Sequence, residues 1–152
     1  LEAGARVVLL PSKAAGSCPV AHVNLWGQSP LIRAAGPLAR YGSDWVLDAL
    51  DLDLNRSWIR AVPVGELGLE EAFEPFVRLC YTHDSPGPVK LLDQLSAARV
   101  GEGMLVLCSL DLFEPAGRLL LAEILGWLSK GEPALDPRAR VNPETVRRWA
   151  GA

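Results

Sequence analysis

The sequence predicts an α/β domain with a layered mixed sheet, because short apolar runs alternate with helical patterns along its 152 residues. Hydrophobic residues make up 49% of the chain and charged residues 22%, enough for one globular domain with its own core. Late in the chain, a Gly-x-Gly turn between two apolar runs predicts an antiparallel hairpin, so the sheet is mixed rather than purely parallel. We expect about five or six strands and two or three helices.

The first apolar run, Val7 to Pro11, is continuous and typical of a strand buried on both faces. Residues 12–37 are rich in Gly, Ser and Pro, which predicts loops around a short extended piece, Val20 to Leu25. Ser43 follows Gly42 and precedes an apolar pattern, so we expect it to cap a helix.

Three further strands are predicted in the middle of the chain. Trp58 to Val64 ends in a Pro and a Gly, and a helical turn is expected at 69–72. Phe76 to Thr82 alternates as a strand does, and a loop follows it. Val89 to Val100 is the third strand and the first arm of the hairpin.

The hairpin turns at Gly101 and Gly103, which we expect to supply backbone angles that side chains resist. Its second arm is Met104 to Leu112, and a helix is predicted from Ala116 to Lys130. The apolar face of this helix consists of Leu120, Ile124, Trp127 and Leu128. Gly131 follows the helix and is expected to end it. We therefore expect a domain at 1–131, and a linker with a short helix, from Pro143 to Trp149, at 132–152.

Charge and hydropathy narrow the choice of partners. The formal net charge is -3, so no global basic field favours a nucleic acid. The longest apolar stretches, such as Met104 to Leu110, fall far short of the roughly 20 residues that span a bilayer. From Pro137 onward four Arg accompany one Glu, which predicts a solvated helix surface or, as the alternative, a partner surface.

The three cysteines are Cys18, Cys80 and Cys108, an odd number without a C-x-x-C pair, so no structural zinc or other cofactor is predicted. Cys80 and Cys108 lie in apolar runs and are expected to be buried thiols. Cys18 is the nearest candidate for a catalytic thiol, with His22 or His83 as its base. Pro19 follows it, however, and removes the backbone N–H that an oxyanion hole would use.

Trp26 is the best candidate for an exposed aromatic side chain, because it lies in the loop-like stretch from Asn24 to Gln28. Exposed Trp faces stack on sugar rings, as they do on other flat apolar faces, and Asn24 and Gln28 flank Trp26 in this stretch. We therefore name Trp26, Asn24 and Gln28 as candidate carbohydrate-binding residues. Packing of Trp26 in the core or against another domain is the alternative.

The stretch 97–112, with its Val-Gly-x-Gly turn and the strand that ends Cys-Ser-Leu-Asp-Leu, resembles a segment near the C-terminus of large bacterial family 2 glycoside hydrolases (β-galactosidase-like enzymes). The helix at 116–128 follows as it does in that family. Ser43 to Trp45 and Pro75 to Arg78 are similar to its upstream helix and strand. The resemblance implies a layered mixed sheet of flavodoxin-like or amidotransferase-like type, without the amidotransferase nucleophile.

The same resemblance implies a non-catalytic accessory module of a glycosidase, for packing against the parent's other domains or for weak carbohydrate binding. The parent's catalytic carboxylates would lie in a separate barrel domain, so no catalytic residue is assigned to this chain. An oligomerisation scaffold, with a second copy as partner, and a thiol-dependent amidotransferase-like hydrolase remain as alternatives. The chain starts at Leu1 in what reads as the end of a helix, so we expect a piece of a larger protein. The sequence does not indicate in which cellular compartment the protein works.

Overall fold

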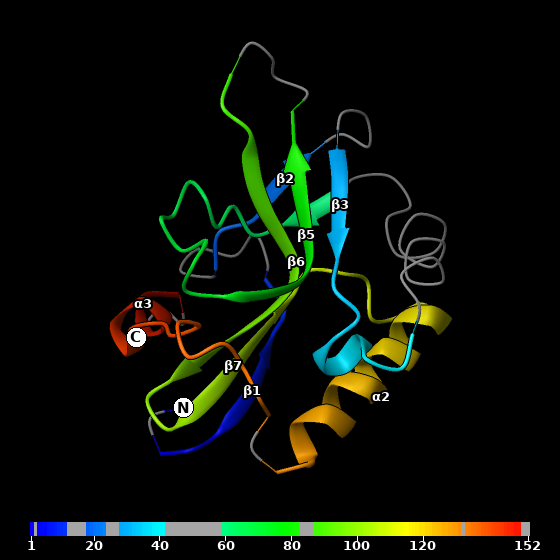
Figure 1. The fold of residues 1–152 in the computed structure, drawn as a ribbon, viewed down its shortest axis with the longest axis vertical. Coiled ribbons are helices and arrows are strands. Elements are labelled where there is room, and N and C mark those ends of the chain that lie inside the picture. Colours follow the sequence, from blue (N-terminus) through cyan, green and yellow to red (C-terminus); the bar gives the residue numbers. More distant parts are fainter. Residues whose placement is uncertain are drawn as a thin grey trace.

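The computed structural model describes residues 1, 3–11, 18–23, 28–41, 59–82, 87–131 and 133–149. Within these ranges a five-stranded sheet has the order β1-β7-β6-β5-β3, and β2 and β4 form a second, two-stranded sheet (Figure 1). The elements are β1 (Arg6–Leu9), β2 (Ala21–Val23), β3 (Gln28–Ile32), the 3₁₀ helix η1 (Gly36–Leu38), β4 (Ile59–Ala61), β5 (Glu74–Tyr81), β6 (Lys90–Val100), β7 (Gly103–Cys108), α2 (Pro115–Ser129) and α3 (Pro143–Trp149).

The main sheet is mixed, as the sequence predicts. β1 pairs parallel with β7, whereas the β7–β6, β6–β5 and β5–β3 pairs are antiparallel. The β6–β7 hairpin is confirmed, with Val100 opposite Gly103. Seven strands are present among the described residues, one or two more than expected, because Gln28–Ile32, in a stretch predicted to form loops, is strand β3 and pairs with β5.

The two turn glycines serve different purposes. Gly101 has a φ of +60°, in the left-handed region that side chains resist, as expected. Gly103 does not: a Cβ there would lie 2.1 Å from the carbonyl oxygen of Leu1 and 2.4 Å from that of Ala5. Close approach of the N-terminal backbone, and not an unusual dihedral angle, therefore requires a glycine at 103.

Two layers cover the sheet. α2 and η1 pack on one face, while α3 and the turn before β5 pack on the other (Figure 1). On the first face Phe76 meets Trp127 edge to face, with ring centroids 5.5 Å apart. On the second, Phe73 stacks on Trp149 at 6.4 Å. The helix predicted to end at Gly131 is confirmed as α2, with Leu120, Ile124 and Leu128 buried and Trp127 half-buried.

Two strand predictions need correction. Val7 to Pro11 does not form a strand buried on both faces: Val7 is 38% exposed, and β1 is an edge strand in the sheet that the described residues form. β7 ends at Cys108, four residues before Leu112, because the chain turns there toward the start of α2. The helix expected from Ser43, and the ends of the runs at Leu25 and Trp58, lie outside the described residues.

The tail after α2 packs along the end of β6. The Arg99 amide donates to the carbonyl of Ala139 at 2.8 Å, and the Val141 amide donates to the carbonyl of Arg99 at 2.9 Å. Ala139 and Val141 are buried, and α3 then lies against the sheet. None of the helices in the described ranges is long and apolar enough to cross a membrane.

Candidate functional site

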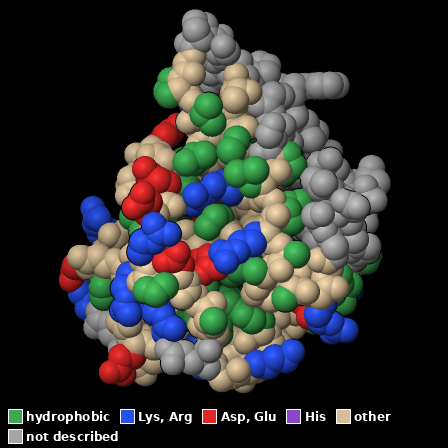
Figure 2. Space-filling model, in the orientation of Figure 1, with side chains coloured by type: hydrophobic (Ala, Val, Ile, Leu, Met, Phe, Trp, Pro, Cys, Tyr) green, Lys and Arg blue, Asp and Glu red, His purple; other side chains and the backbone are tan. Residues whose placement is uncertain are grey.

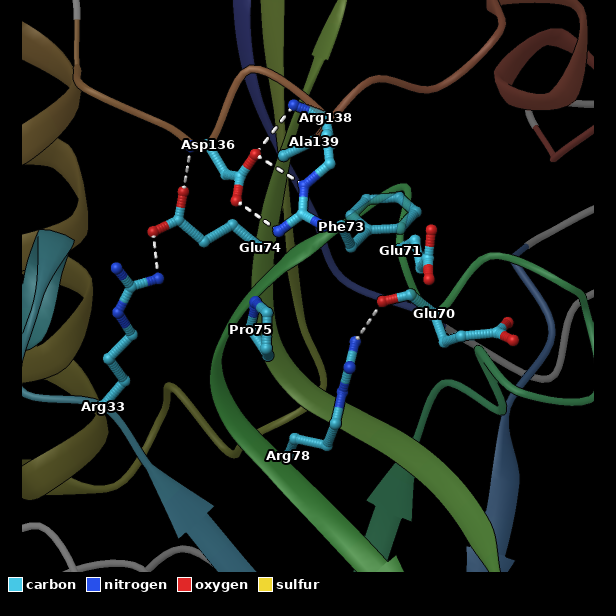
Figure 3. A pocket seen from close by; sticks show the side chains of 10 residues that line it. All are labelled: Arg33, Glu70, Glu71, Phe73, Glu74, Pro75, Arg78, Asp136, Arg138 and Ala139. Carbon is cyan, nitrogen blue, oxygen red and sulfur yellow. Dashed lines mark hydrogen bonds and ion pairs between the residues drawn. The ribbon is translucent and has the colours of Figure 1, made fainter.

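A polar cleft of about 360 Å³ lies among the described residues. It lies at the start of β5, where the segment after β3, the turn before β5 and the tail after α2 meet (Figure 3). Most of its lining is charged side chains, which come from the start of β5, the segment after β3, the turn before β5 and the tail after α2. The lining residues are Arg33, Glu70, Glu71, Phe73, Glu74, Pro75, Arg78, Asp136, Arg138 and Ala139.

Glu74 joins three of these segments. Its carboxylate is buried and accepts a hydrogen bond from Arg33 Nη1 at 2.5 Å through Oε1. Its Oε2 accepts a hydrogen bond from the backbone amide of Asp136 at 2.6 Å. Figure 3 shows this carboxylate between the Arg33 guanidinium and the tail. One side chain at the start of β5 therefore holds both walls of the cleft in place.

Asp136 and Arg138 form the rim. Arg138 donates through Nε to Oδ1 at 3.2 Å and through Nη2 to Oδ2 at 3.0 Å, and its backbone amide also donates to Oδ1 at 2.9 Å. The Arg138 side-chain and backbone hydrogen bonds lower the pKa of Asp136 to about 2. Asp136 is therefore ionised throughout the neutral range.

Arg78 and Asp93 form the pair beneath the cleft. Arg78 donates to the two carboxylate oxygens at 2.5 Å and 3.1 Å, and its Nη2 also donates to the carbonyl of Glu70 at 3.0 Å. The Asp93 side chain is 0% exposed. Burial raises the pKa of Asp93, and the hydrogen bonds and charge of Arg78 oppose that rise.

The three arginines of the cleft are thus each paired with a carboxylate. Ion pairs fix the side chains and balance their charge, while unused guanidinium N–H groups remain to donate. The surface of this face carries Lys and Arg side chains close beside Asp and Glu side chains (Figure 2). The arrangement can therefore donate hydrogen bonds to oxygen atoms of a ligand from arginines whose charge is already paired.

The described residues among those named from the sequence do not line this cleft. Gln28 is the first residue of β3, opposite Tyr81, and β3 has four more residues before Arg33 of the cleft. Trp26 and Asn24 lie outside the described residues. Gly101 and Gly103 are in the β6–β7 turn. Sequence reasoning missed Arg33, Glu74 and Arg138, because they come from segments far apart in the chain.

The thiols are poorly placed for catalysis. Cys18 is buried, and burial raises its pKa to about 12. Burial also raises the pKa of Cys108 to about 12. Cys80, expected to be buried, is half-buried. His22 is exposed on β2, and His83 lies outside the described residues.

The described part of the chain contains no group of three or more His, Cys, Asp or Glu side chains placed to hold a metal ion. The sequence matches no protein-family model, and no curated protein matches it significantly.

Proposed function

We propose that this chain is a non-catalytic accessory module of a carbohydrate-active enzyme of the family 2 glycoside hydrolase type, and that its cleft binds a neutral sugar weakly. The observation that carries the proposal is the set of three ion pairs, Arg33–Glu74, Arg138–Asp136 and Arg78–Asp93, in and beneath one cleft. The sequence resemblance at 97–128 supports the parent class, and the mixed sheet with α2 after β7 fits the broad α/β class. A flavodoxin-like or amidotransferase-like arrangement is the finer part of the proposal and rests on the resemblance alone.

The ion pairs favour hydroxyl groups as ligands for a physical reason. A guanidinium that is already neutralised and positioned by a carboxylate loses little conformational entropy when it donates a further hydrogen bond. Arg33 and Arg138 have exposed side chains and line opposite sides of Glu74. Both can donate to ring or hydroxyl oxygens of a sugar without leaving a buried charge unpaired.

Three carboxylates in and beneath the cleft, those of Asp136, Asp93 and Glu74, are poorly suited to be the general acid of glycosidic bond cleavage. A general acid must be protonated and must reach the leaving oxygen. Asp136 has a pKa of about 2 and is ionised, whereas the carboxyl of Asp93 is raised in pKa but has no exposed surface. Glu74 has both oxygens engaged. These groups bind and position rather than transfer protons.

A thiol-dependent hydrolase is the less favoured alternative. A nucleophilic cysteine needs a lowered pKa and an open approach, and Cys18 has neither.

Packing against another domain of the parent enzyme has better support than thiol catalysis. Phe113, between β7 and α2, is 79% exposed, which is unusual for so large an apolar side chain.

The experiment is an NMR titration of the ¹⁵N-labelled chain with galactosides and plant-wall oligosaccharides. We expect amide shifts at 33–34, 74–78 and 136–139, and a weaker affinity for Arg138→Gln, by about tenfold, since a hydrogen bond to a charged group is lost. Arg147→Gln is the matched control, because Arg147 forms a similarly exposed ion pair with Glu144 outside the cleft. Shifts confined to other regions, or equal affinities of the two variants, would refute the proposal.

A further inference from the structure

A second polar pocket, of about 300 Å³, lies where the start of β1, the β6–β7 turn and the tail after α2 come together. Figure 1 shows these three parts at the same end of the main sheet. This pocket, which we name the turn pocket, shares no lining residue with the cleft. The residues that line it are Gly4, Arg6, Arg99, Glu102, Gly103, Met104 and Pro133.

The strand register places one arginine on each side of the turn pocket. Arg6 of β1 pairs with Met104 of β7, and Met104 pairs with Arg99 of β6. Paired residues of neighbouring strands point to the same face of a sheet, so the two arginines flank Met104 with their backbones about 10 Å apart. Met104 is buried and lines the pocket between them.

A third arginine continues this row. Arg140 of the tail forms a parallel bridge with Arg99, through the backbone hydrogen bonds of Arg99 to Ala139 and Val141. The bridge places the side chains of Arg99 and Arg140 next to each other on one face of the sheet. Like charges in such positions repel each other, and a bound anion relieves that repulsion. Arg140 does not line the turn pocket, but its charge adds to the positive potential there.

Positive charge exceeds negative charge around the turn pocket. Glu102 is the acidic side chain in the lining, and it is exposed in the turn. The row of three arginines therefore outweighs it. Arg6 is already positioned, since its Nη1 donates to the carbonyl of Leu128 in the last turn of α2. A guanidinium has five N–H donors, so this contact leaves others that can bind the oxygens of a ligand.

We propose that the turn pocket binds a tetrahedral oxyanion, a phosphate or sulfate group of a small-molecule ligand, between Arg6 and Arg99. Guanidinium groups form paired, charge-assisted hydrogen bonds with the oxygens of such groups, and these are stronger than neutral hydrogen bonds. A tetrahedral oxyanion presents oxygens in several directions, so it can accept hydrogen bonds from both sides of Met104 at once. Because the turn pocket and the cleft share no lining residue, failure of one proposal leaves the other standing.

An NMR titration of the ¹⁵N-labelled chain with inorganic phosphate, and separately with sulfate, tests the inference. We expect amide shifts at 4–6 and 99–104 that sodium chloride at the same ionic strength does not cause. Arg6→Gln and Arg99→Gln should each raise the dissociation constant by about tenfold, because each removes a hydrogen bond between charged groups. Arg148→Gln is the matched control, since Arg148 is an exposed arginine of α3 that does not line the pocket.

Glu102→Gln gives a second test with the opposite sign. Glu102 is exposed in the turn, so its replacement leaves the core untouched, and the loss of its negative charge should tighten binding by about twofold to fivefold. Glu144→Gln makes the same change of net charge on α3, outside the pocket, and should leave the affinity nearly unchanged. Circular dichroism establishes that each variant is folded.

Binding of phosphate alone, of sulfate alone or of both supports the proposal and identifies the group that the pocket accepts. The proposal is overturned if neither anion shifts these amides, or if chloride shifts them equally. It is also overturned if Arg148→Gln weakens binding as much as Arg99→Gln, or if Glu102→Gln tightens it no more than Glu144→Gln.

Discussion

Arg78 and Asp93 lie directly opposite each other in the β5–β6 ladder, and their side chains form a bidentate ion pair at 2.5 Å and 3.1 Å. The pair is buried, with no exposed surface on Asp93. Isolated buried charges are costly, so each partner depends on the other. The pair also anchors the turn before β5, through the hydrogen bond from Arg78 to the carbonyl of Glu70.

We expect Arg78→Met to lower the free energy of unfolding by about 3–5 kcal/mol near neutral pH, because it leaves the Asp93 carboxylate buried and unpaired. The effect should depend on pH. Burial already raises the pKa of Asp93, so its contribution to stability is fully present below its unfolded value of 3.8 and is lost as pH rises through the folded pKa. Without Arg78 that pKa rises further, so the variant loses more stability with increasing pH. Urea denaturation from pH 4 to pH 8 measures this.

Two companion variants sharpen this prediction. Arg147→Met removes the arginine of an exposed ion pair on α3 and should lower the free energy of unfolding by less than about 1 kcal/mol. The double variant Arg78→Met with Asp93→Leu replaces the buried pair by apolar groups and should recover most of the lost stability. If Arg78→Met alone lowers the free energy of unfolding no more at pH 8 than at pH 4, the role given to Asp93 is contradicted.

Gly117 and Gly126 occupy the same helix but have opposite surroundings. A Cβ at Gly117 would lie 1.9 Å from the carbonyl oxygen of Asp111, whereas a Cβ at Gly126 would meet nothing within 4 Å. We expect Gly117→Ala to destabilise the protein by about 1–3 kcal/mol, since the loop after β7 must move. Gly126→Ala should stabilise it by up to about 1 kcal/mol through helix propensity. Thermal and urea unfolding of the two variants measure the contrast.

Helix propensity alone predicts that both alanines stabilise the protein. A loss of stability in Gly117→Ala would therefore show that contact with the loop outweighs helix propensity at this position. Equal gains would mean that the loop at 111–112 does not press against α2. The pair of variants also tests whether the hairpin and the following helix form one packed unit.

Local patterns in the sequence predicted the elements that depend on neighbours along the chain. The β6–β7 hairpin and α2 follow from the Gly-x-Gly turn and from Leu120, Ile124 and Leu128 at helical spacing. The edge position of β1 could not be predicted in this way, because strand order is decided by partners far away in the sequence. For the same reason an apolar run such as Val7 to Pro11 reads as a fully buried strand.

No local pattern in the sequence could have predicted the cleft. Glu74 and Arg33 are 41 residues apart, and Asp136 is 62 residues from Glu74. Each residue alone reads as an ordinary surface charge, and only the antiparallel β5–β3 pairing and the return of the tail bring them together. Gly103 is a similar case, since the carbonyls that exclude a side chain come from the N-terminal segment.

The cysteines offer a direct check on the absence of a reactive thiol. At pH 8 a thiol with a pKa of about 12 is ionised in only about one molecule in ten thousand, so Cys18 and Cys108 should react extremely slowly with a disulfide reagent in the folded protein. Half-buried Cys80 should react first. Mass spectrometry of partly modified protein identifies the site, and denaturation should release all three thiols at similar rates. Rapid modification of Cys18 in the folded chain, lost on unfolding, would instead indicate an activated nucleophile and would revive the hydrolase alternative.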